Sequence, residues 1–329
     1  YSLLLTIGNT FLNQRRVVIV EVSLVVAGTI FMMVLGVNDA TKYTFGEKLA
    51  RIHNYQVTLA LEEQNRIREV ENTAIRLPGV SAVESWLVLP ASARPISQPD
   101  KEVTDARVTV FGQPPETDFY RPELQAGRWL RPNDVNAAVV GLQVSNSKGW
   151  QIGDWITLTD SNDDEIDAQI VGILFDPATS SSVHVPLLTL ERAWGSFGKA
   201  NTVWVQTTST EADAQTAVAE AFEDALEQRS IEVAPGSTFG ENTIAGIIEQ
   251  NSQGNSIIIR LLAVMAVVIA LVGGVGLSGV LSLSVMERRR EIGVMRAIGA
   301  SSWQVIRLFV GEAILLGLLS WLIALPLSI

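Results

Sequence analysis

A run of glycines near the C-terminal end of the sequence has the spacing of a dinucleotide-binding motif. Gly274-Val-Gly-Leu-Ser-Gly279 matches G-x-G-x-x-G, in which glycines let the backbone approach a pyrophosphate. The motif needs a strand before it and an acidic residue about 20 positions later, but this run lies within residues 261–285, which carry no charge. A pyrophosphate in hydrocarbon would be too costly. We instead predict a helix-packing face of small residues four positions apart, Gly274, Ser278 and Ser282.

An acidic segment, residues 160–167, has oxygen-bearing side chains at the first, third and fifth positions of a calcium-binding loop. Glu165 occupies the position that needs glycine, and Val171 occupies the position that needs a bidentate glutamate. We therefore expect a solvated turn between two strands.

A third run, Gly195-Ser-Phe-Gly-Lys-Ala200, is similar to a phosphate-binding loop but has two residues instead of four between its glycines. Ala200 also replaces the hydroxyl that would bind Mg²⁺. No Walker A pattern occurs elsewhere in the chain. If ATP drives this protein, another subunit must bind it.

The residues needed for nucleophilic or metal catalysis are scarce. The chain has no cysteine and two histidines, His53 and His184, which lie 131 positions apart. Neither a zinc site nor a Ser-His triad can be assembled from this pattern. We therefore expect a chain that is not an enzyme, with no catalytic residue, no cofactor-binding residue and no metal ligand.

Two acidic residues, Glu21 and Glu312, lie inside apolar segments. An intramembrane carboxylate is a functional hypothesis by default. Both lie about one turn from the expected cytoplasmic end of a span, where a glutamate can reach the interface or pair with Arg15, Arg16 or Arg307. We favour this structural role over proton coupling, and loss of transport on replacing both by glutamine would overturn that preference.

Long apolar segments must position all of these residues. With 47% hydrophobic and 7% aromatic residues, the chain has the aliphatic composition of a membrane protein. A segment of about 20 apolar residues can cross a bilayer, and we predict spans at residues 17–37, 257–286 and 304–329. Residues 1–16 are predicted to form an amphipathic elbow helix in the cytoplasmic interface.

The charges are distributed in a way that indicates the membrane topology. Residues 38–256 contain 31 acidic and 16 basic residues, whereas the remainder contains 4 acidic and 8 basic residues. Basic residues mark the cytoplasmic side of spans, so residues 38–256 are predicted to be extracytoplasmic. The acidity of this domain also argues against nucleic acid as a partner.

The extracytoplasmic residues are predicted to form an α+β domain. Two strand–helix–strand patterns flank its centre, and this order is typical of a split ferredoxin-like layer. The expected elements are strands at 55–61, 80–89, 202–208 and 231–234, with helices at 62–77 and 211–228. On the second helix, Ala214, Val218, Phe222, Ala225 and Leu226 are expected to share one face.

We call this ferredoxin-like layer the porter part of the domain and assign it to residues of about 38–113 and 177–240. Short alternating runs with Gly and Pro at about 114–176 predict an inserted small β-rich subdomain. Residues 241–256 have a helical pattern with less hydrophobicity, so a stalk is expected before the second span.

A short cytoplasmic helix is predicted after the second span, at residues 287–300. Charged residues occupy one side of this helix and apolar residues another. Gly299 is the expected C-terminal stop, and residues 301–304 have the pattern of a capping box for the next helix. Arginines alone would satisfy a topological anchor. The apolar residues between them, Ile292, Val294, Met295 and Ile298, indicate a docking face for a partner.

The run ERRREIGVMRAIGASSWQVIRLFVGEAILLG resembles the cytoplasmic segment of FtsX/MacB-like permeases of ABC transporters, whose pattern is E-R-x-x-E-I-G-x-x-R-A-x-G-A. The external runs AGRWLRPNDVNAAVVG, GWQIGDWITL and VHVPLLTLERAWG are similar to the periplasmic core domain of that family. The resemblance implies that the loop is a coupling helix that contacts a separate ATPase. It assigns this role to Glu287, Arg288, Glu291, Ile292, Gly293, Val294, Arg296, Ala297, Ile298 and Gly299.

The resemblance also implies the partners and the limits of the chain. ATP and Mg²⁺ are expected on a partner cytoplasmic ABC ATPase, and a second permease half, as a homodimer or a tandem pseudo-dimer, is expected beside this one. The other expected partners are the lipid bilayer and an extracytoplasmic protein. The family has four spans, so we expect a fourth beyond Ile329 and further chain before Tyr1. The expected location is a bacterial cytoplasmic membrane, with several passes.

Three other classes of protein compete with this interpretation. A membrane-anchored sensor would bind a ligand with the external domain and signal through the loop, and a neighbouring histidine kinase gene would favour it. A proton-coupled exporter needs buried charges, which are sparse here. A membrane-anchored enzyme needs a catalytic constellation, which the sequence does not offer.

Overall fold

The computed structural model describes residues 14–96, 105–114, 116–179, 181–234 and 243–327. The chain divides into two compact units. One contains residues 1–41 and 253–329, and the other contains residues 42–252. Most of the elbow helix predicted for residues 1–16 lies outside the described residues.

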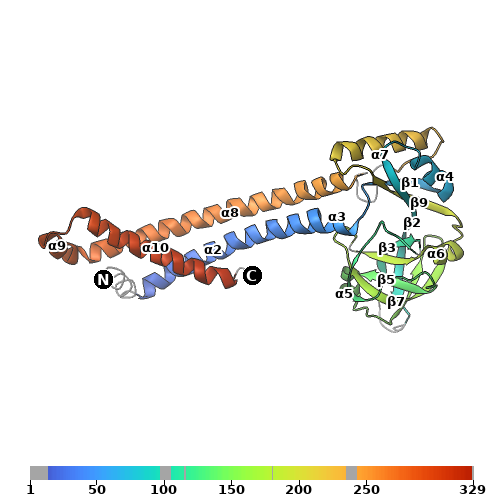
Figure 1. The fold of residues 1–329 in the computed structure, drawn as a ribbon. Helices are drawn as coiled ribbons and strands as arrows, with labels where there is room; N and C mark the ends of the chain where they lie inside the picture. Colours follow the sequence, from blue (N-terminus) through green and yellow to red (C-terminus); the bar gives the residue numbers. More distant parts are fainter. Residues whose placement is uncertain (1–13, 97–104, 115, 180, 235–242, 328–329) are drawn as a thin grey trace. The chain divides into compact units, whose positions relative to one another are not determined.

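Long helices make up the first unit (Figure 1). They are α2 (Gln14–Lys42), α8 (Ile244–Glu287) and α10 (Ser302–Leu327), with the short α9 (Arg289–Ala297) between the last two. Among the described residues, three segments are long and apolar enough to cross a membrane, at 24–52, 259–276 and 302–327. Their side chains are largely uncovered within the chain, as Leu271 and Val275 show with exposed fractions of 65% and 74%. Such a helix is suited to lipid.

Small residues allow α2 to pack closely against its neighbours. A Cβ atom on Gly28 of α2 would lie 3.1 Å from the Cβ atom of Ala324 in α10. Gly273 of α8 faces Leu24 of α2 at ordinary van der Waals distance. Close backbone approach at small residues is the main way in which helices associate in lipid.

The second unit begins with a π-helical turn, η1 (Tyr43–Lys48), and the short α3 (Leu49–Ile52). A layer follows that contains β1 (Val57–Arg66), α4 (Ile67–Ala74), β2 (Val80–Pro95), β9 (Lys199–Thr207) and α7 (Ala212–Glu227). The strands pair in the antiparallel order β1-β9-β2. Val233 adds a bridge to Leu61 at the outer side of β1.

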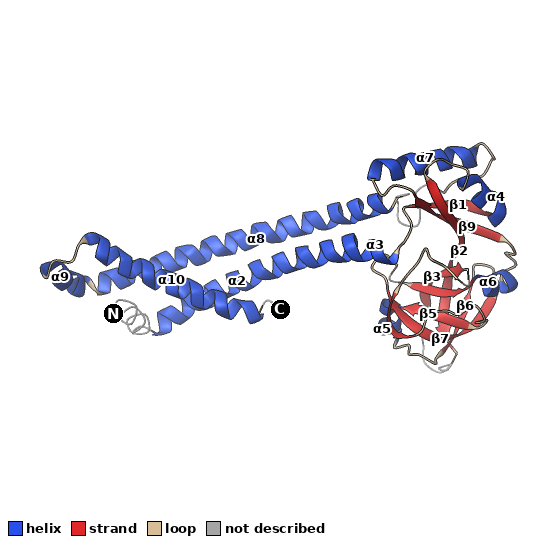
Figure 2. Cartoon of the chain, viewed as in Figure 1, coloured by secondary structure: helices blue, strands red, loops and turns tan. Residues whose placement is uncertain are grey.

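This order is that of a ferredoxin-like layer, so the predicted order of strands and helices is confirmed. The boundary expected between the first strand and its helix was wrong, because β1 extends to Arg66 whereas a helix was expected from residue 62. The helices α4 and α7 cover one face of the strands (Figure 2). Val218, Phe222 and Leu226 of α7 are buried in that core, as the periodicity predicts. The predicted last strand, 231–234, is reduced to an isolated bridge.

The remaining strands form a barrel. Its elements are β3 (Ala106–Gln113), β4 (Glu123–Gly127), β5 (Ala137–Gly141), α5 (Leu142–Lys148), β6 (Trp155–Thr159), β7 (Glu165–Phe175), β8 (Ser182–Pro186) and α6 (Leu187–Ala193). The order β2-β3-β8-β5-β7 closes because β6 pairs with both β2 and β7. Closure removes most free strand edges.

The long strand β2 belongs to both parts of this unit. Residues 80–86 pair with β9, and residues 87–95 pair with β3 and β6. The predicted insert, 114–176, contains β4 to β7 and α5, while β3, β8 and the second half of β2 complete the same barrel. The barrel core is filled by aliphatic side chains such as Val110, Ile156 and Leu158.

Candidate functional site

The turn that follows α9 has the hydrogen bonds of a Schellman motif. The amide of Ala300 donates to the carbonyl of Met295 at 2.9 Å, and the amide of Gly299 donates to the carbonyl of Arg296 at 3.1 Å. Gly299 has a φ of +97°, a conformation that side chains with a Cβ atom rarely adopt. The predicted C-terminal stop at Gly299 is therefore confirmed.

The next helix begins with the predicted capping box. The amide of Ser301 donates to the side-chain oxygen of Gln304 at 2.8 Å, and the amide of Gln304 donates to the hydroxyl of Ser301 at 3.4 Å. Both ends of the short connection between α9 and α10 are thus defined by local hydrogen bonds. This arrangement holds α9 as a separate helix between two long ones.

The residues predicted for ATPase coupling lie together on and beside α9. The helix has no buried residue. Its most exposed apolar side chains are Val294, 58% exposed, and Ile298, 81% exposed, whereas Ile292 and Met295 are partly covered. The full predicted set is Glu287, Arg288, Glu291, Ile292, Gly293, Val294, Arg296, Ala297, Ile298 and Gly299. We call the exposed pair Val294 and Ile298 the α9 apolar face, and its role as a docking site stays a prediction.

The predicted helix-packing residues lie on a side of α8 that is open in the single chain. Gly274, Ser278 and Ser282 are exposed, and a Cβ atom on Gly274 would have no neighbour within 4 Å. The glycine of α8 that approaches another described helix is the adjacent Gly273. The run 274–279 lies within continuous helix, which uses its backbone amides for helical hydrogen bonds.

The two intramembrane acids lie in different helices. Glu21 is partly buried in α2, beside Ser320 of α10. Glu312 lies in α10, and its side chain is outside the described part of the structure. The choice between an interfacial and a proton-coupled role stays a prediction.

The acidic run at 160–167 forms the turn between β6 and β7. The Asp160 carboxylate accepts hydrogen bonds from the amides of Asn162 and Asp164, at 2.8 and 2.9 Å. The other glycine-rich run, 195–200, is a loop in which Gly195 and Gly198 both have a φ of +65°. The hydrogen bonds that Asp160 accepts are those of an ordinary turn stabilised by a side chain.

A buried polar network in the second unit was not anticipated from the sequence. His53, directly after α3, lies 3.2 Å from the carboxylate of Asp176, which follows β7. The Tyr120 hydroxyl donates to the same carboxylate at 2.7 Å, and the Thr179 hydroxyl donates at 2.8 Å. The other ring nitrogen of His53 lies 3.0 Å from the hydroxyl of Tyr55. Residues from three separate segments, at 53–55, 120 and 176–179, thus form one buried network.

This environment shifts the pKa of Asp176. Burial by itself would raise the pKa of the Asp176 carboxyl, but the charge of His53 and the hydrogen bonds from His53, Tyr120 and the Ala178 amide outweigh it. The pKa of Asp176 is therefore held well below its usual range. An ionised and fully hydrogen-bonded carboxylate fastens the end of β7 to the segment that follows α3.

The second histidine lies in an aromatic stack beside this network. The ring of His184 stacks on those of Phe111 and Tyr120, with centroids 4.8 and 5.0 Å apart. Burial lowers the pKa of His184 to about 3. His184, 131 positions from His53 in the chain, is thus connected with the Asp176 network through Tyr120. No local sequence pattern indicates this network, because its residues come from different strands and loops.

The chain matches two protein-family models. The MacB-like periplasmic core domain matches residues 22–225, and the FtsX-like permease C-terminal model matches residues 263–329. Together they cover most of the chain; the first includes the second unit as far as residue 225, and the second includes α9.

Several curated proteins are similar in sequence. An uncharacterized ABC transporter permease of Methanocaldococcus jannaschii is 28% identical over 218 residues, which is 63% of this chain and 51% of that protein. The macrolide export ATP-binding/permease protein MacB of Marinobacter nauticus is 25% identical over 273 residues, 83% of this chain and 37% of that protein. This chain thus spans about half the length of these relatives or less.

Solved structures with a similar course of the chain include the periplasmic region of MacB from Actinobacillus actinomycetemcomitans. That match has 13% identity and a TM-score of 0.40, and it covers 58% of this chain and 92% of that one. The extracellular domain of the noncanonic ABC-type transporter YknZ from Gram-positive bacteria matches with 18% identity and a TM-score of 0.38. It covers 55% of this chain and 98% of that structure.

Proposed function

The chain belongs to the MacB/FtsX-type ABC transporter permease family, and on this basis we propose that it transmits ATP-driven motion from a separate cytoplasmic ATPase to its extracytoplasmic domain. It is a membrane protein with a large α+β domain, and we place it in a bacterial cytoplasmic membrane as a multi-pass protein. ATP and Mg²⁺ bind to the partner ATPase in this scheme.

The observation that supports the proposal is the α9 apolar face. Val294 lies on a helix with no buried residue and Ile298 directly follows its last residue, in a segment that also carries Arg289, Arg290 and Arg296. Arginines keep the segment on the cytoplasmic side. Exposed aliphatic side chains in water are unfavourable by about 25 cal/mol per Å² unless a partner covers them. An ATPase surface that covers this face would receive or deliver force at α9.

The connection from α9 to the domain outside the membrane runs through α8, which is one continuous helix from Ile244 to Glu287. In this scheme, movement of α9 reaches the second unit through Ile244 and Ile247 of α8, which are buried in its core. The open side of α8 at Gly274, Ser278 and Ser282 would pack against a second permease half. In this scheme the work is done on the outer side of the membrane, on an exported compound, a lipoprotein, a peptide or a cell-wall enzyme.

Crosslinking from a single introduced cysteine tests the coupling proposal. The chain has no cysteine of its own, so the introduced residue is its only thiol. Val294→Cys is labelled with a thiol-to-amine crosslinker in membranes that also contain a candidate ABC ATPase from the same genome. We expect a crosslinked product whose yield differs between the ATP-bound and the nucleotide-free state. Thr216→Cys, an exposed position on α7, is the matched control and is expected to give no product.

The result that contradicts the proposal is the absence of a Val294→Cys product in both nucleotide states while the two proteins co-purify. Co-purification would then show an interface elsewhere. A product of equal yield from Val294→Cys and Thr216→Cys would also contradict it, because random collision would explain both.

A further inference from the structure

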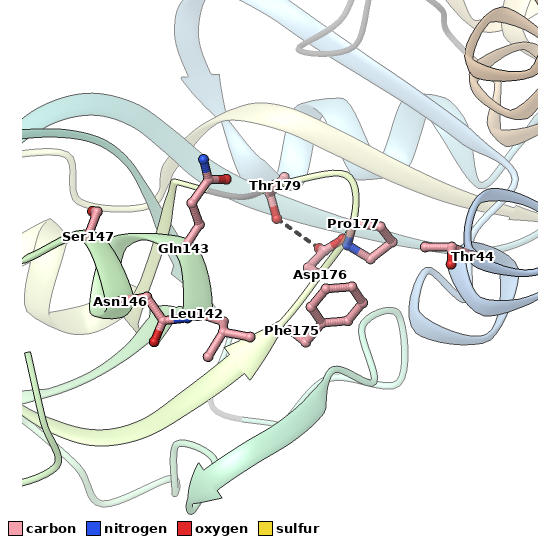
Figure 3. Close-up of a pocket in the computed structure, with 9 residues that line it drawn as sticks. All are labelled: Thr44, Leu142, Gln143, Asn146, Ser147, Phe175, Asp176, Pro177 and Thr179. Carbon is pink, nitrogen blue, oxygen red and sulfur yellow. Dashed lines mark hydrogen bonds between the residues drawn. The ribbon is translucent and has the colours of Figure 1, made fainter. Parts of the chain in front are cut away.

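The second unit contains a cavity of about 670 Å³ that the coupling scheme does not use (Figure 3). Its walls come from three places in the chain. The π-helical turn η1 contributes Thr44, the helix α5 contributes residues 142–147, and the end of β7 with the following loop contributes residues 175–179. A volume between about 300 and 1,000 Å³ is that of a small-molecule site.

The polar part of the wall consists of uncharged groups. Gln143, Asn146 and Ser147 on α5 line the cavity, with Thr44 and Thr179 contributing from other walls. Within the described part of the chain, the side-chain amides of Gln143 and Asn146 have no hydrogen-bond partner. Each amide can donate and accept at once. Such groups match hydroxyl and amide groups on a ligand.

The one ionised wall residue, Asp176, offers a ligand no free charge. Its side chain has no exposed area, and its oxygens accept from Tyr120 and Thr179 and lie against His53. The ammonium of Lys48 lies 4.5 Å from the ring centroid of the lining residue Phe175 and is paired with Glu123 at 2.5 Å. The wall residues therefore offer a charged ligand no free counter-charge.

The rest of the wall is apolar. Leu142 of α5 and Phe175 at the end of β7 face the same space, and Pro177 lies beyond them (Figure 3). Apolar side chains on one side and hydrogen-bonding side chains on the other are the usual lining of a small-molecule site. A ligand with an apolar face and hydroxyl or amide groups would satisfy both.

We propose that this cavity binds a small uncharged ligand that carries hydroxyl or amide groups beside an apolar face. N-acetylated sugars and uncharged peptide segments share this chemistry. The site is independent of the α9 apolar face, so either proposal can fail while the other stands.

The position of the cavity predicts a consequence of binding. Thr44 belongs to η1, and π-helical turns occur often at functional sites. A ligand that contacts both Thr44 and α5 would join the start of this unit to the barrel. It would also cover the loop that holds Asp176, and so stabilise the His53–Asp176 contact.

Saturation-transfer NMR on the full chain in phosphatidylcholine nanodiscs tests the proposal. The neutral probes are N,N′-diacetylchitobiose and N-acetyl-alanyl-alanine amide. The charged counterparts are chitobiose with free amines and the same dipeptide with a free carboxylate. We expect at least one neutral probe to bind with a Kd of about 1 mM or tighter, and its charged counterpart to bind at least about tenfold more weakly.

Three variants locate the binding. Asn146→Trp fills the cavity from an exposed helical position, and the double variant Gln143→Ala with Asn146→Ala removes both amides. Each is expected to weaken binding of the neutral probe by about tenfold or more. Gln151→Ala removes an exposed amide outside the cavity and is expected to change nothing. Circular dichroism of each variant verifies that the domain is folded.

The outcomes separate clearly. Binding by one neutral probe and not the other supports the proposal and identifies the ligand class as sugar or peptide. Failure of both neutral probes overturns it, as does equal binding of neutral and charged probes. Binding that is unchanged in folded Asn146→Trp overturns it too, because the ligand would then lie elsewhere.

Discussion

Lowering the pH is expected to destabilise the extracytoplasmic domain through the buried side chain of His184. The pKa of His184 is lowered to about 3 by burial, with the charge of Asp176 raising it and that of His53 lowering it further. In the unfolded chain the pKa of a histidine is about 6.5. Between these two values the unfolded state binds a proton that the folded state does not, so stability falls as the pH falls.

The size of the effect follows from the two pKa values. Well inside this pH window, each unit by which the pH falls lowers the free energy of unfolding by about 1.4 kcal/mol. Between pH of about 6.5 and 4.5 the total decrease is about 2 kcal/mol. Below about pH 4.5 the carboxylates begin to titrate, so the measurement stays above that value.

The perturbation is His184→Phe. A phenyl ring keeps the stacking on Phe111 and Tyr120 and removes the titrating nitrogens. Urea unfolding of the domain in the full chain, followed by fluorescence of tryptophans such as Trp86 and Trp129 near this ring, gives the free energy at each pH. The wild type should lose about 2 kcal/mol more than the variant between pH of about 6.5 and 4.5.

His53 is present in both proteins, so the difference isolates His184. Parallel pH profiles for the wild type and His184→Phe would refute the reasoning. They would mean that the His184 ring is protonated in the folded domain and is compensated by a nearby charge.

Two further predictions concern the Asp176 network and the end of α9. Asp176→Ala leaves the hydroxyl of Tyr120 and the ring of His53 without their buried partner, so the free energy of unfolding should fall by about 3–5 kcal/mol. Urea unfolding measures this loss. A loss below about 1 kcal/mol would show that water replaces the carboxylate. Gly299→Ala places a Cβ atom on a residue with a φ of +97°, which costs about 1–2 kcal/mol. Because this strain disturbs the end of α9, ATP hydrolysis by the partner ATPase should be stimulated less by the permease. Unchanged stimulation would contradict our account of α9. Ala300→Gly, beside it, is the control.

Elements that depend on neighbouring residues were predictable from the sequence. The cap at Ser301 with Gln304, the stop at Gly299 and the buried face of α7 are all produced by residues within four positions of one another. Hydrophobic length and charge likewise predicted the long apolar helices. These features are determined locally because helix hydrogen bonds and side-chain periodicity span only a turn or two.

Features that join distant segments were decided only by the tertiary structure. The strand β2 was expected to end near Leu89, but its second half pairs with β3 and β6, and no local pattern specifies those partners. His53 and His184 lie 131 positions apart, so no local pattern connects them. Barrel closure brings the strand and loop ends together, and the free energy gained by burying these rings and pairing Asp176 depends on that closure. The sequence by itself therefore determines the local helices, caps and apolar segments, whereas the Asp176 network and the cavity beside it exist only in the folded domain.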